Sequence, residues 1–320
     1  MRWFAKPASI LVPVLVLASV TAGPGGDGPP PRSLTHPNAT PRAHAPHRRT
    51  APARPDLGVY RGLGTWIDVY DVAWRHPGIA VRRMRRRGVE TLYLQTSNHS
   101  RTRPFVFKEG VERFVDAAHR NGISVVAWYL PGLRDLRTDF RRSMAAIRFR
   151  TARGNRFDSF AMDIEDDGVR RPGVRTERLL RLSRWIRRAG GPSYPLGAII
   201  PSPLRLRTDT RYWPHFPYRR LARLYDVFLP MTYFTYRVHG RSGARWYTGG
   251  NIRLIRQQTG DREVPIHVIG GIGGAAGSSE TAGFVHAVRG HHVIGASYYT
   301  FPFVSEQEWR ELAKVPRRAG

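Results

Sequence analysis

Residues 157–165 read Phe157-Asp-Ser-Phe-Ala-Met-Asp-Ile-Glu165. The run is apolar enough for a buried strand, and it ends in two acids spaced two residues apart. Alternate residues of a strand point to the same face, so Asp163 and Glu165 lie on one face where this strand finishes. In an eight-stranded α/β barrel that face is the interior, and the carboxyl end of each strand opens at the mouth.

Seven further apolar runs lie on either side of this one, and helical patterns separate them. Strands that alternate with helices predict parallel β units, and eight such units predict a closed (β/α)8 TIM barrel rather than an open doubly wound sheet. No glycine-rich phosphate loop follows the first run, which also disfavours the open sheet. The predicted strands are residues 64–70, 89–95, 123–130, 157–165, 196–201, 225–233, 264–270 and 293–299, within a barrel domain at 59–320.

Turn and cap residues support this division. The apolar pattern of residues 179–186 ends at Gly190-Gly191, a fitting helix stop, and Ser278 or Ser279 is expected to cap a helix that runs to Val288. Gly270-Gly271-Ile272-Gly273-Gly274 follows the seventh strand. We interpret these glycines as a tight loop at the barrel mouth, with a phosphate-binding loop as the alternative.

The N-terminal part of the chain reads as an export signal followed by a linker. Arg2 and Lys6 precede an apolar stretch, and small residues near Ala22 fit a cleavage site, so residues 1–22 are expected to be a signal peptide. Residues 23–58 are rich in proline and poor in large apolar residues, which predicts a disordered, basic linker. We therefore expect a secreted or cell-envelope protein, with no membrane span in its mature form.

The net charge of +28 predicts attraction to polyanions. No basic block interleaved with aromatic residues resembles a nucleic-acid module, so anionic cell-wall polymers are the better expected partners. The chain contains no cysteine and no paired histidines at zinc-ligand spacing. We expect a monomer that needs no metal and no cofactor.

The acid pair at the end of the fourth strand carries the expected chemistry. Buried carboxylates are costly unless they are paired, and two neighbouring carboxylates raise the pKa of one of them, as a general acid at neutral pH requires. The structural alternative is that Asp163 and Glu165 form ion pairs with arginines at the rim. Asp166 and Asp167 are expected to be solvated or to cap a helix.

Several other residues near strand ends are candidate substrate contacts. Gln95 ends the second predicted strand, Trp128 lies near the end of the third, and Tyr298 lies in the eighth. Aromatic rings stack on the apolar faces of sugars, although packing in the barrel is the alternative for each ring. Asp68 lies near the end of the first predicted strand and would serve the site or a structural role. Trp213, Trp246 and Tyr247 are predicted to lie in long loops, where they would wall a cleft.

The segment 158–165 resembles the fourth-strand signature of family 18 glycoside hydrolases, the chitinase-like barrels, in which acids at the strand end share one face. Pro230-Met231-Thr232-Tyr233 is similar to the Met-x-Tyr-Asp element of that family. The resemblance implies that Glu165 protonates the glycosidic oxygen, that Asp163 orients a substrate N-acetyl nucleophile, and that Tyr233 hydrogen-bonds the same group. Met231 shares a face with Tyr233 and is expected to contact substrate.

Two positions depart from the family 18 pattern: Ala161 stands where that family has an Asp, and Phe234 replaces the Asp after the tyrosine. A weaker resemblance links Trp66-Ile-Asp68-Val69 and Asp163-x-Glu165 to the family 25 muramidases. The expected function is cleavage of glycosidic bonds in a cell-envelope or extracellular polysaccharide. The alternatives are an inactive carbohydrate-binding barrel tethered at the envelope, and a binder of anionic polymers in which the barrel is only a scaffold.

Overall fold

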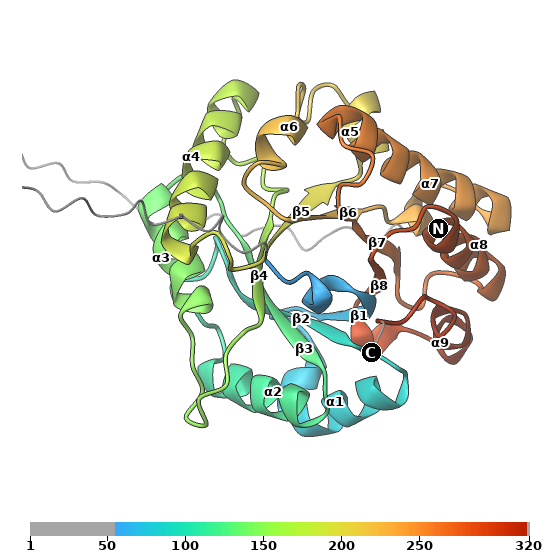
Figure 1. The fold of residues 1–320 in the computed structure, drawn as a ribbon, viewed down its shortest axis with the longest axis horizontal. Helices are drawn as coiled ribbons and strands as arrows, with labels where there is room; N and C mark the ends of the chain where they lie inside the picture. Colours follow the sequence, from blue (N-terminus) through green and yellow to red (C-terminus); the bar gives the residue numbers. More distant parts are fainter. Residues whose placement is uncertain (1–54, 319–320) are drawn as a thin grey trace, which may run out of the picture. The chain divides into compact units, whose positions relative to one another are not determined.

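The computed structural model describes residues 55–318, and these residues form a closed barrel of eight parallel strands (Figure 1). Each strand pairs with the next along the chain, and β8 pairs with β1, so that Gly62 lies opposite Gly295. The predicted TIM barrel is confirmed. The strands are β1 (Gly62–Ile67), β2 (Thr91–Asn98), β3 (Ser124–Leu130), β4 (Ser159–Asp163), β5 (Leu196–Pro201), β6 (Val227–Met231), β7 (His267–Ile272) and β8 (Gly295–Tyr299).

Helices form a ring around the strands (Figure 1). Their bounds are α1 (Pro77–Arg86), α2 (Lys108–Arg120), α3 (Leu136–Ile147), α4 (Pro172–Gly190), α5 (Pro203–Thr208), α6 (Tyr218–Leu221), α7 (Gly240–Thr259), α8 (Ser278–Gly290) and α9 (Glu306–Leu312). Short 3-10 turns lie at η1 (Gly58–Tyr60), η2 (Val72–Arg75), η3 (Phe234–Tyr236) and η4 (Phe301–Phe303). None of the helices in the described part of the chain is long and apolar enough to cross a membrane.

The expected signal peptide at 1–22 and most of the expected linker at 23–58 lie outside the described residues. The last four residues of that linker segment are described. Leu57 already packs against the cluster of side chains inside the barrel, and the Asp56 carboxylate accepts a hydrogen bond from the Gly58 N–H at 2.8 Å.

Strand alternation divides the core into two layers. The outer layer joins the strands to the surrounding helices, and the inner layer fills the barrel. The inner layer contains Tyr60, Trp66, Tyr93, Val126, Trp128, Ala161, Ile199, Val227, Leu229, Met231 and Ile269. Because the interior is packed with side chains, it is a core and not a channel.

The amino-terminal end of the barrel is closed by buried polar contacts. Tyr60 is fully buried, and its hydroxyl shares a hydrogen bond with the Ser159 hydroxyl at 2.6 Å. The Nδ1 atom of His267 lies 2.8 Å from the carbonyl oxygen of Tyr60, and burial lowers the pKa of His267 to about 4. Neutral, packed groups at this end leave the carboxyl ends of the strands as the place for chemistry.

Hydrogen bonds of the Asp158 side chain connect the start of β4 to β3 and α2. Its Oδ2 accepts the N–H of Val125, next to the start of β3, at 2.7 Å and lies 2.9 Å from Nε2 of His119 on α2. The hydrogen bond to Asp158 raises the pKa of His119, more than burial lowers it. The first acid of the 158–165 segment is therefore a structural residue.

The raised pKa of His119 makes part of the stability depend on pH. A group whose pKa rises on folding stabilises the protein below its unfolded pKa, and this stability is lost as the pH rises through the folded value. We expect His119→Gln to cost about 1 kcal/mol near pH 5, because the pair is partly exposed, and progressively less towards pH 9. Urea unfolding of both proteins from pH 5 to pH 9 measures the difference, with His76→Gln, at an exposed position, as the control. A cost independent of pH would contradict this account.

Several sequence expectations differ from the structure at element ends. The first strand begins two residues earlier than predicted, and β4 and β6 each end two residues earlier.

The aromatic residues predicted in long loops also differ from expectation. Trp246 and Tyr247 lie within α7 rather than in a loop. Trp213 is buried beneath the guanidinium of Arg175, which lies 4.1 Å from the centre of the Trp213 ring. Gly277 precedes α8 in place of a serine cap, and its N–H donates to the Glu280 carboxylate at 2.8 Å.

The glycine segment after the seventh strand forms a tight turn, as expected, with its first residues inside β7. The carboxylate of Glu308 on α9 is fully buried and accepts hydrogen bonds from the N–H groups of Gly274, Ala276 and Ser305. An anion-binding loop needs such N–H groups for its ligand. Here a side chain of the protein occupies them, which argues against the phosphate-loop alternative.

Candidate active site

Asp163 and Glu165 lie at the mouth of the barrel. Asp163 is the last residue of β4 and shares a face with Ala161, which packs in the interior. Its side chain is almost completely buried, with 5% of the residue exposed. Glu165 lies two residues beyond the strand and is half-buried, and the hydroxyl of Tyr212 donates a hydrogen bond to its carbonyl oxygen. Strand direction and alternation thus bring both acids to the same opening.

Tyr233 lies at the same end of the barrel as these acids, two strands away from β4. It follows β6 in a left-handed conformation with φ 33°, which turns the chain into η3, and its ring packs against the interior cluster. Burial raises the pKa of Tyr233, and the negative charges of Glu165 and Asp163 raise it further. The effect of both acids on Tyr233 indicates that its side chain lies near theirs at the mouth.

Asp68 and Tyr299 form the next part of the mouth. The Tyr299 hydroxyl donates to Oδ2 of Asp68 at 2.6 Å, and Oδ1 of Asp68 accepts the Tyr70 N–H at 2.7 Å. Burial and the charge of Asp68 raise the pKa of Tyr299. Asp71 lies nearby, and burial followed by the charge of Asp68 raises its pKa to about 6 despite the hydrogen bond from Ala73.

Three of the expected substrate contacts lie in the floor below these acids. Gln95 is buried, and its Oε1 accepts the Val69 N–H at 3.0 Å, which positions the chain just after Asp68. Met231 and Trp128 belong to the interior cluster, and Trp128 meets the ring of Trp66 edge-on at 5.7 Å. The structure therefore places these residues beside the mouth. The side chain of Gln95 is already engaged there in its hydrogen bond with the backbone of Val69.

Tyr298 does not lie at the mouth, and its prediction as a substrate contact was wrong. Its ring is fully buried in the outer layer against Phe234 and Phe284, and its hydroxyl donates to Thr281 on α8 at 3.1 Å. The reason is the register of β8. Ser297 points inward, where it accepts a hydrogen bond from Trp66, so Tyr298 points outward and Tyr299 inward.

The sequence interpretation missed two contributors to the site. Tyr212 comes from the segment after α5, and burial, followed by the charges of Glu165 and Asp163, raises its pKa. Asp166 was expected to be solvated or to cap a helix, but it pairs with His99 at 3.1 Å and accepts the Gly168 N–H at 2.9 Å. This pair ties the loop that carries Glu165 to the end of β2. Neither residue carries a signal in the sequence, because each acts through a partner distant along the chain.

The arrangement combines a buried carboxylate, a half-buried acid and tyrosine hydroxyls around one opening. Such a set is suited to proton transfer and to stabilising positive charge, without a metal ion.

Several solved structures share this fold. The spore cortex-lytic enzyme SleL of Bacillus cereus matches with a TM-score of 0.59 and 9% identity, over 81% of this chain and 76% of that chain. A chitinase of Bacteroides thetaiotaomicron matches with a TM-score of 0.58 and 8% identity, over 80% and 95%. A GH18 chitinase of Cycas revoluta, solved with (GlcNAc)4, matches with a TM-score of 0.57 and 11% identity, over 79% and 98%.

The chain has the fold of the chitinase barrels. The fold implied by the resemblance to family 18 is thereby confirmed, although identities this low show the fold alone. No protein-family model matches the sequence, and no curated protein matches it.

The two residues that depart from the family 18 pattern, Ala161 and Phe234, are both buried among apolar side chains. Ala161 is fully buried in the barrel interior, where its Cβ lies 3.1 Å from the position that a Cβ on Gly197 would take. Phe234 is fully buried in the outer layer, between the rings of Phe284 and Tyr298. An acid at either position would enter an apolar environment, so these substitutions fit the packing of this chain.

Proposed function

We propose that this protein is a glycoside hydrolase that cleaves a polysaccharide of the cell envelope or its surroundings. The supporting observation is the position of Asp163 and Glu165, one at the end of β4 and one just beyond it, in a mouth bordered by Tyr233 and Asp68. The chitinase fold agrees with this chemistry. The proposal includes export, which the sequence of residues 1–22 supports.

The proposed reaction assigns one role to each group. Glu165 donates its proton to the glycosidic oxygen while the bond from that oxygen to the anomeric carbon breaks. The buried charge of Asp163 stabilises the positive charge that develops at the sugar ring. The acetamido oxygen of the substrate attacks the anomeric carbon, as in substrate-assisted hydrolysis, and water then opens that intermediate. The Tyr233 hydroxyl positions the acetamido group.

The floor of the mouth offers further contacts for a sugar. Within residues 55–318, the buried Nε1 of Trp128 has no hydrogen-bond partner. Buried polar groups are nearly always paired in native proteins, so an unpaired donor beside acidic residues is a candidate for binding a sugar oxygen. Asp68, held by Tyr299, would accept a hydrogen bond from a sugar hydroxyl.

A second candidate is a barrel that binds carbohydrate without cleaving it. Ala161 and Phe234 favour this function, because both lack the carboxylates that support Asp163 in the family pattern. The intact Asp163 and Glu165 favour hydrolysis instead.

Reducing-end release distinguishes the two functions. The protein would be incubated with isolated bacterial cell wall, chitin oligosaccharides and aryl glycosides. Release from any of them supports a hydrolase, and the best substrate identifies the linkage. Binding to these glycans without release, under the same conditions, would support the binding barrel and reject hydrolysis.

A pair of neighbouring tyrosines tests the orientation of β8. Tyr299→Phe removes the hydroxyl that orients Asp68, so we expect kcat/KM to fall by about tenfold to a hundredfold with little loss of stability. Tyr298→Phe removes only the hydrogen bond to Thr281, which should cost about 1 kcal/mol of stability and leave kcat/KM unchanged. Steady-state kinetics and urea unfolding of both variants check this. The reverse pattern would place Tyr298 at the substrate.

A further inference from the structure

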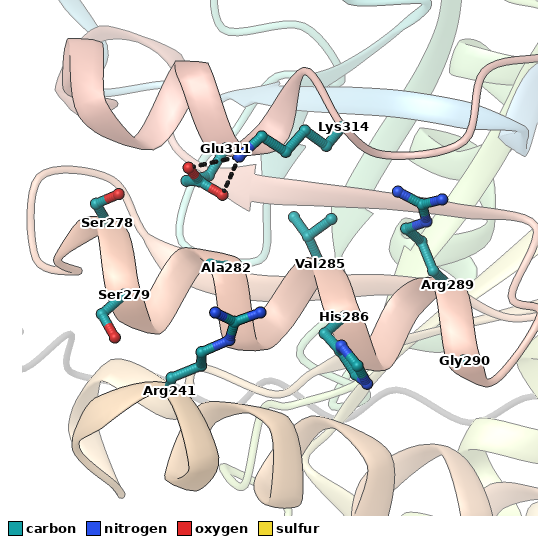
Figure 2. Close-up of a pocket in the computed structure, with 10 residues that line it drawn as sticks. All are labelled: Arg241, Ser278, Ser279, Ala282, Val285, His286, Arg289, Gly290, Glu311 and Lys314. Carbon is teal, nitrogen blue, oxygen red and sulfur yellow. Dashed lines mark hydrogen bonds and ion pairs between the residues drawn. The ribbon is translucent and has the colours of Figure 1, made fainter.

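Two adjoining hollows lie away from the barrel mouth, over the helices α7, α8 and α9. One has a volume of about 910 Å³ and is lined by residues of all three helices (Figure 2). The other has a volume of about 950 Å³ and lies between α7 and α8. They share Arg241, His286 and Gly290, so they adjoin each other along α8. We call these two adjoining hollows together the basic groove, defined by Arg241, Arg245, Trp246, Arg253, His286, Arg289 and His291.

Helix geometry concentrates positive charge in the basic groove. Arg241, Arg245 and Arg253 are spaced by four and eight residues, which places them along one side of α7. The helix α7 contains no Asp or Glu, and like charges at this spacing destabilise a helix. The close approach of α8 at Gly283, where a Cβ would lie 2.1 Å from the carbonyl oxygen of Arg241, brings Arg289 and His286 to the same groove.

The acidic residues of this face are engaged elsewhere. Glu280 accepts the N–H groups of Gly240 and Gly277 at 3.1 and 2.8 Å. Glu311 on α9 pairs with Lys314, just beyond the end of that helix, at 2.8 Å, as Figure 2 shows. Among residues 55–318, the ion pairs leave the four arginines of the groove without a carboxylate. The positive potential also affects His291, whose pKa is lowered by burial and then by Arg253, Arg256 and Arg245.

An exposed aromatic ring accompanies these charges. Trp246 lines the groove between α7 and α8, and 59% of it is exposed to solvent. Its neighbour Tyr247 is buried, so Trp246 is exposed because it lies on the side of α7 that faces away from the core. A flat ring beside guanidinium groups suits a ligand that combines sugar rings with negative charges, because the ring stacks on the sugar while arginine binds carboxylate or phosphate.

From this combination we infer that the basic groove is a second binding site, which holds a linear anionic glycan whose units carry carboxylate or phosphodiester groups. The site is separate from the acids at the mouth and retains the protein on an anionic polymer, whether or not the mouth cleaves glycosidic bonds. The net positive charge of the chain does not account for this site. Attraction by net charge alone would require neither the hollow nor the exposed ring of Trp246.

Binding assays with defined polymers test this inference. The probes are polygalacturonate for carboxylates, purified wall teichoic acid for phosphodiesters, inorganic polyphosphate as a chain without rings, and polyuridylate. We expect Arg245→Glu/Arg253→Glu to weaken binding of one or both glycans by about tenfold or more and to reduce its salt dependence. Trp246→Ala should weaken glycan binding by about threefold to tenfold and leave polyphosphate binding unchanged.

The matched control is Arg82→Glu/Arg86→Glu on α1, which changes the net charge equally at exposed positions on another helix. It should leave glycan affinity within about twofold of the original protein. If both double variants weakened glycan binding equally, the binding would come from the net charge of the protein and not from the groove, and the inference would be overturned. Tighter binding of polyuridylate, with the same dependence on Trp246, would assign the groove to nucleic acid and overturn it too. Circular dichroism and urea unfolding show that the variants are folded, and Glu165→Gln should bind the glycans normally.

Discussion

Glu165→Gln is expected to lower reducing-end release by about 10²- to 10⁴-fold, because glutamine cannot donate the proton that the leaving oxygen requires. The substitution keeps the size of the side chain, and the contact of Tyr212 is made to the backbone carbonyl of residue 165 and not to its side chain. Substrate affinity and stability should therefore change little. The comparison uses kcat and KM on the best substrate from the panel, with unfolding by urea alongside.

Asp167→Asn provides the matched control for the loss at Glu165. Asp167 is exposed on the same loop and makes the equivalent change from acid to amide, so it should retain nearly full activity. If Glu165→Gln retained activity as well, Glu165 would not be the acid. If the two variants lost activity equally, the effect would come from disturbance of the loop and not from proton donation.

Glu308→Gln is expected to lower the free energy of unfolding by about 3 kcal/mol. The carboxylate is fully buried and accepts three backbone N–H groups, from Gly274, Ala276 and Ser305. An amide in its place turns one acceptor into a donor that faces other donors, so at least one buried N–H loses its partner. Urea unfolding followed by far-UV circular dichroism measures the cost.

Glu306→Gln on the same helix is the control for Glu308. Its side chain is 69% exposed and pairs with Arg87 at the surface, so the change should cost less than about 1 kcal/mol. Similar costs for both variants would show that the buried carboxylate does not stabilise the β7 turn. We also expect Glu308→Gln to reduce activity, because the turn it holds follows β7 at the barrel mouth.

The fold was accessible from sequence because its signals are local and repeated. Each strand is a short apolar run, each helix has an apolar side, and glycines such as Gly191, with φ 85°, mark helix ends. The end of the fourth strand was equally clear, because two acids spaced by two must share a face whatever the register with neighbouring strands. Asp163 and Glu165 could therefore be found without a structure.

The sequence did not show which side chains of a strand point into the barrel where both faces of that strand are apolar or aromatic. In β8, Tyr298 and Tyr299 are adjacent and chemically identical, and only the pairing of Ser297 opposite Gly64 determines which ring enters the barrel. The hydrogen bond from Trp66 to Ser297 spans 231 residues, so no local pattern encodes it. Tyr212 was missed for the same reason, since its contact with residue 165 depends on how the segment after α5 returns over the mouth.

The eight-unit barrel, the acid pair and the positive charge follow from the amino-acid sequence, because periodicity, spacing and composition are properties of the chain. Three other features follow only from the folded arrangement: Tyr299 and not Tyr298 faces the mouth, Glu308 fills the glycine turn, and positive charge gathers between α7 and α8. These outcomes depend on the packing of segments distant in sequence, and the free energy of such contacts is set by three-dimensional neighbours that no local pattern specifies.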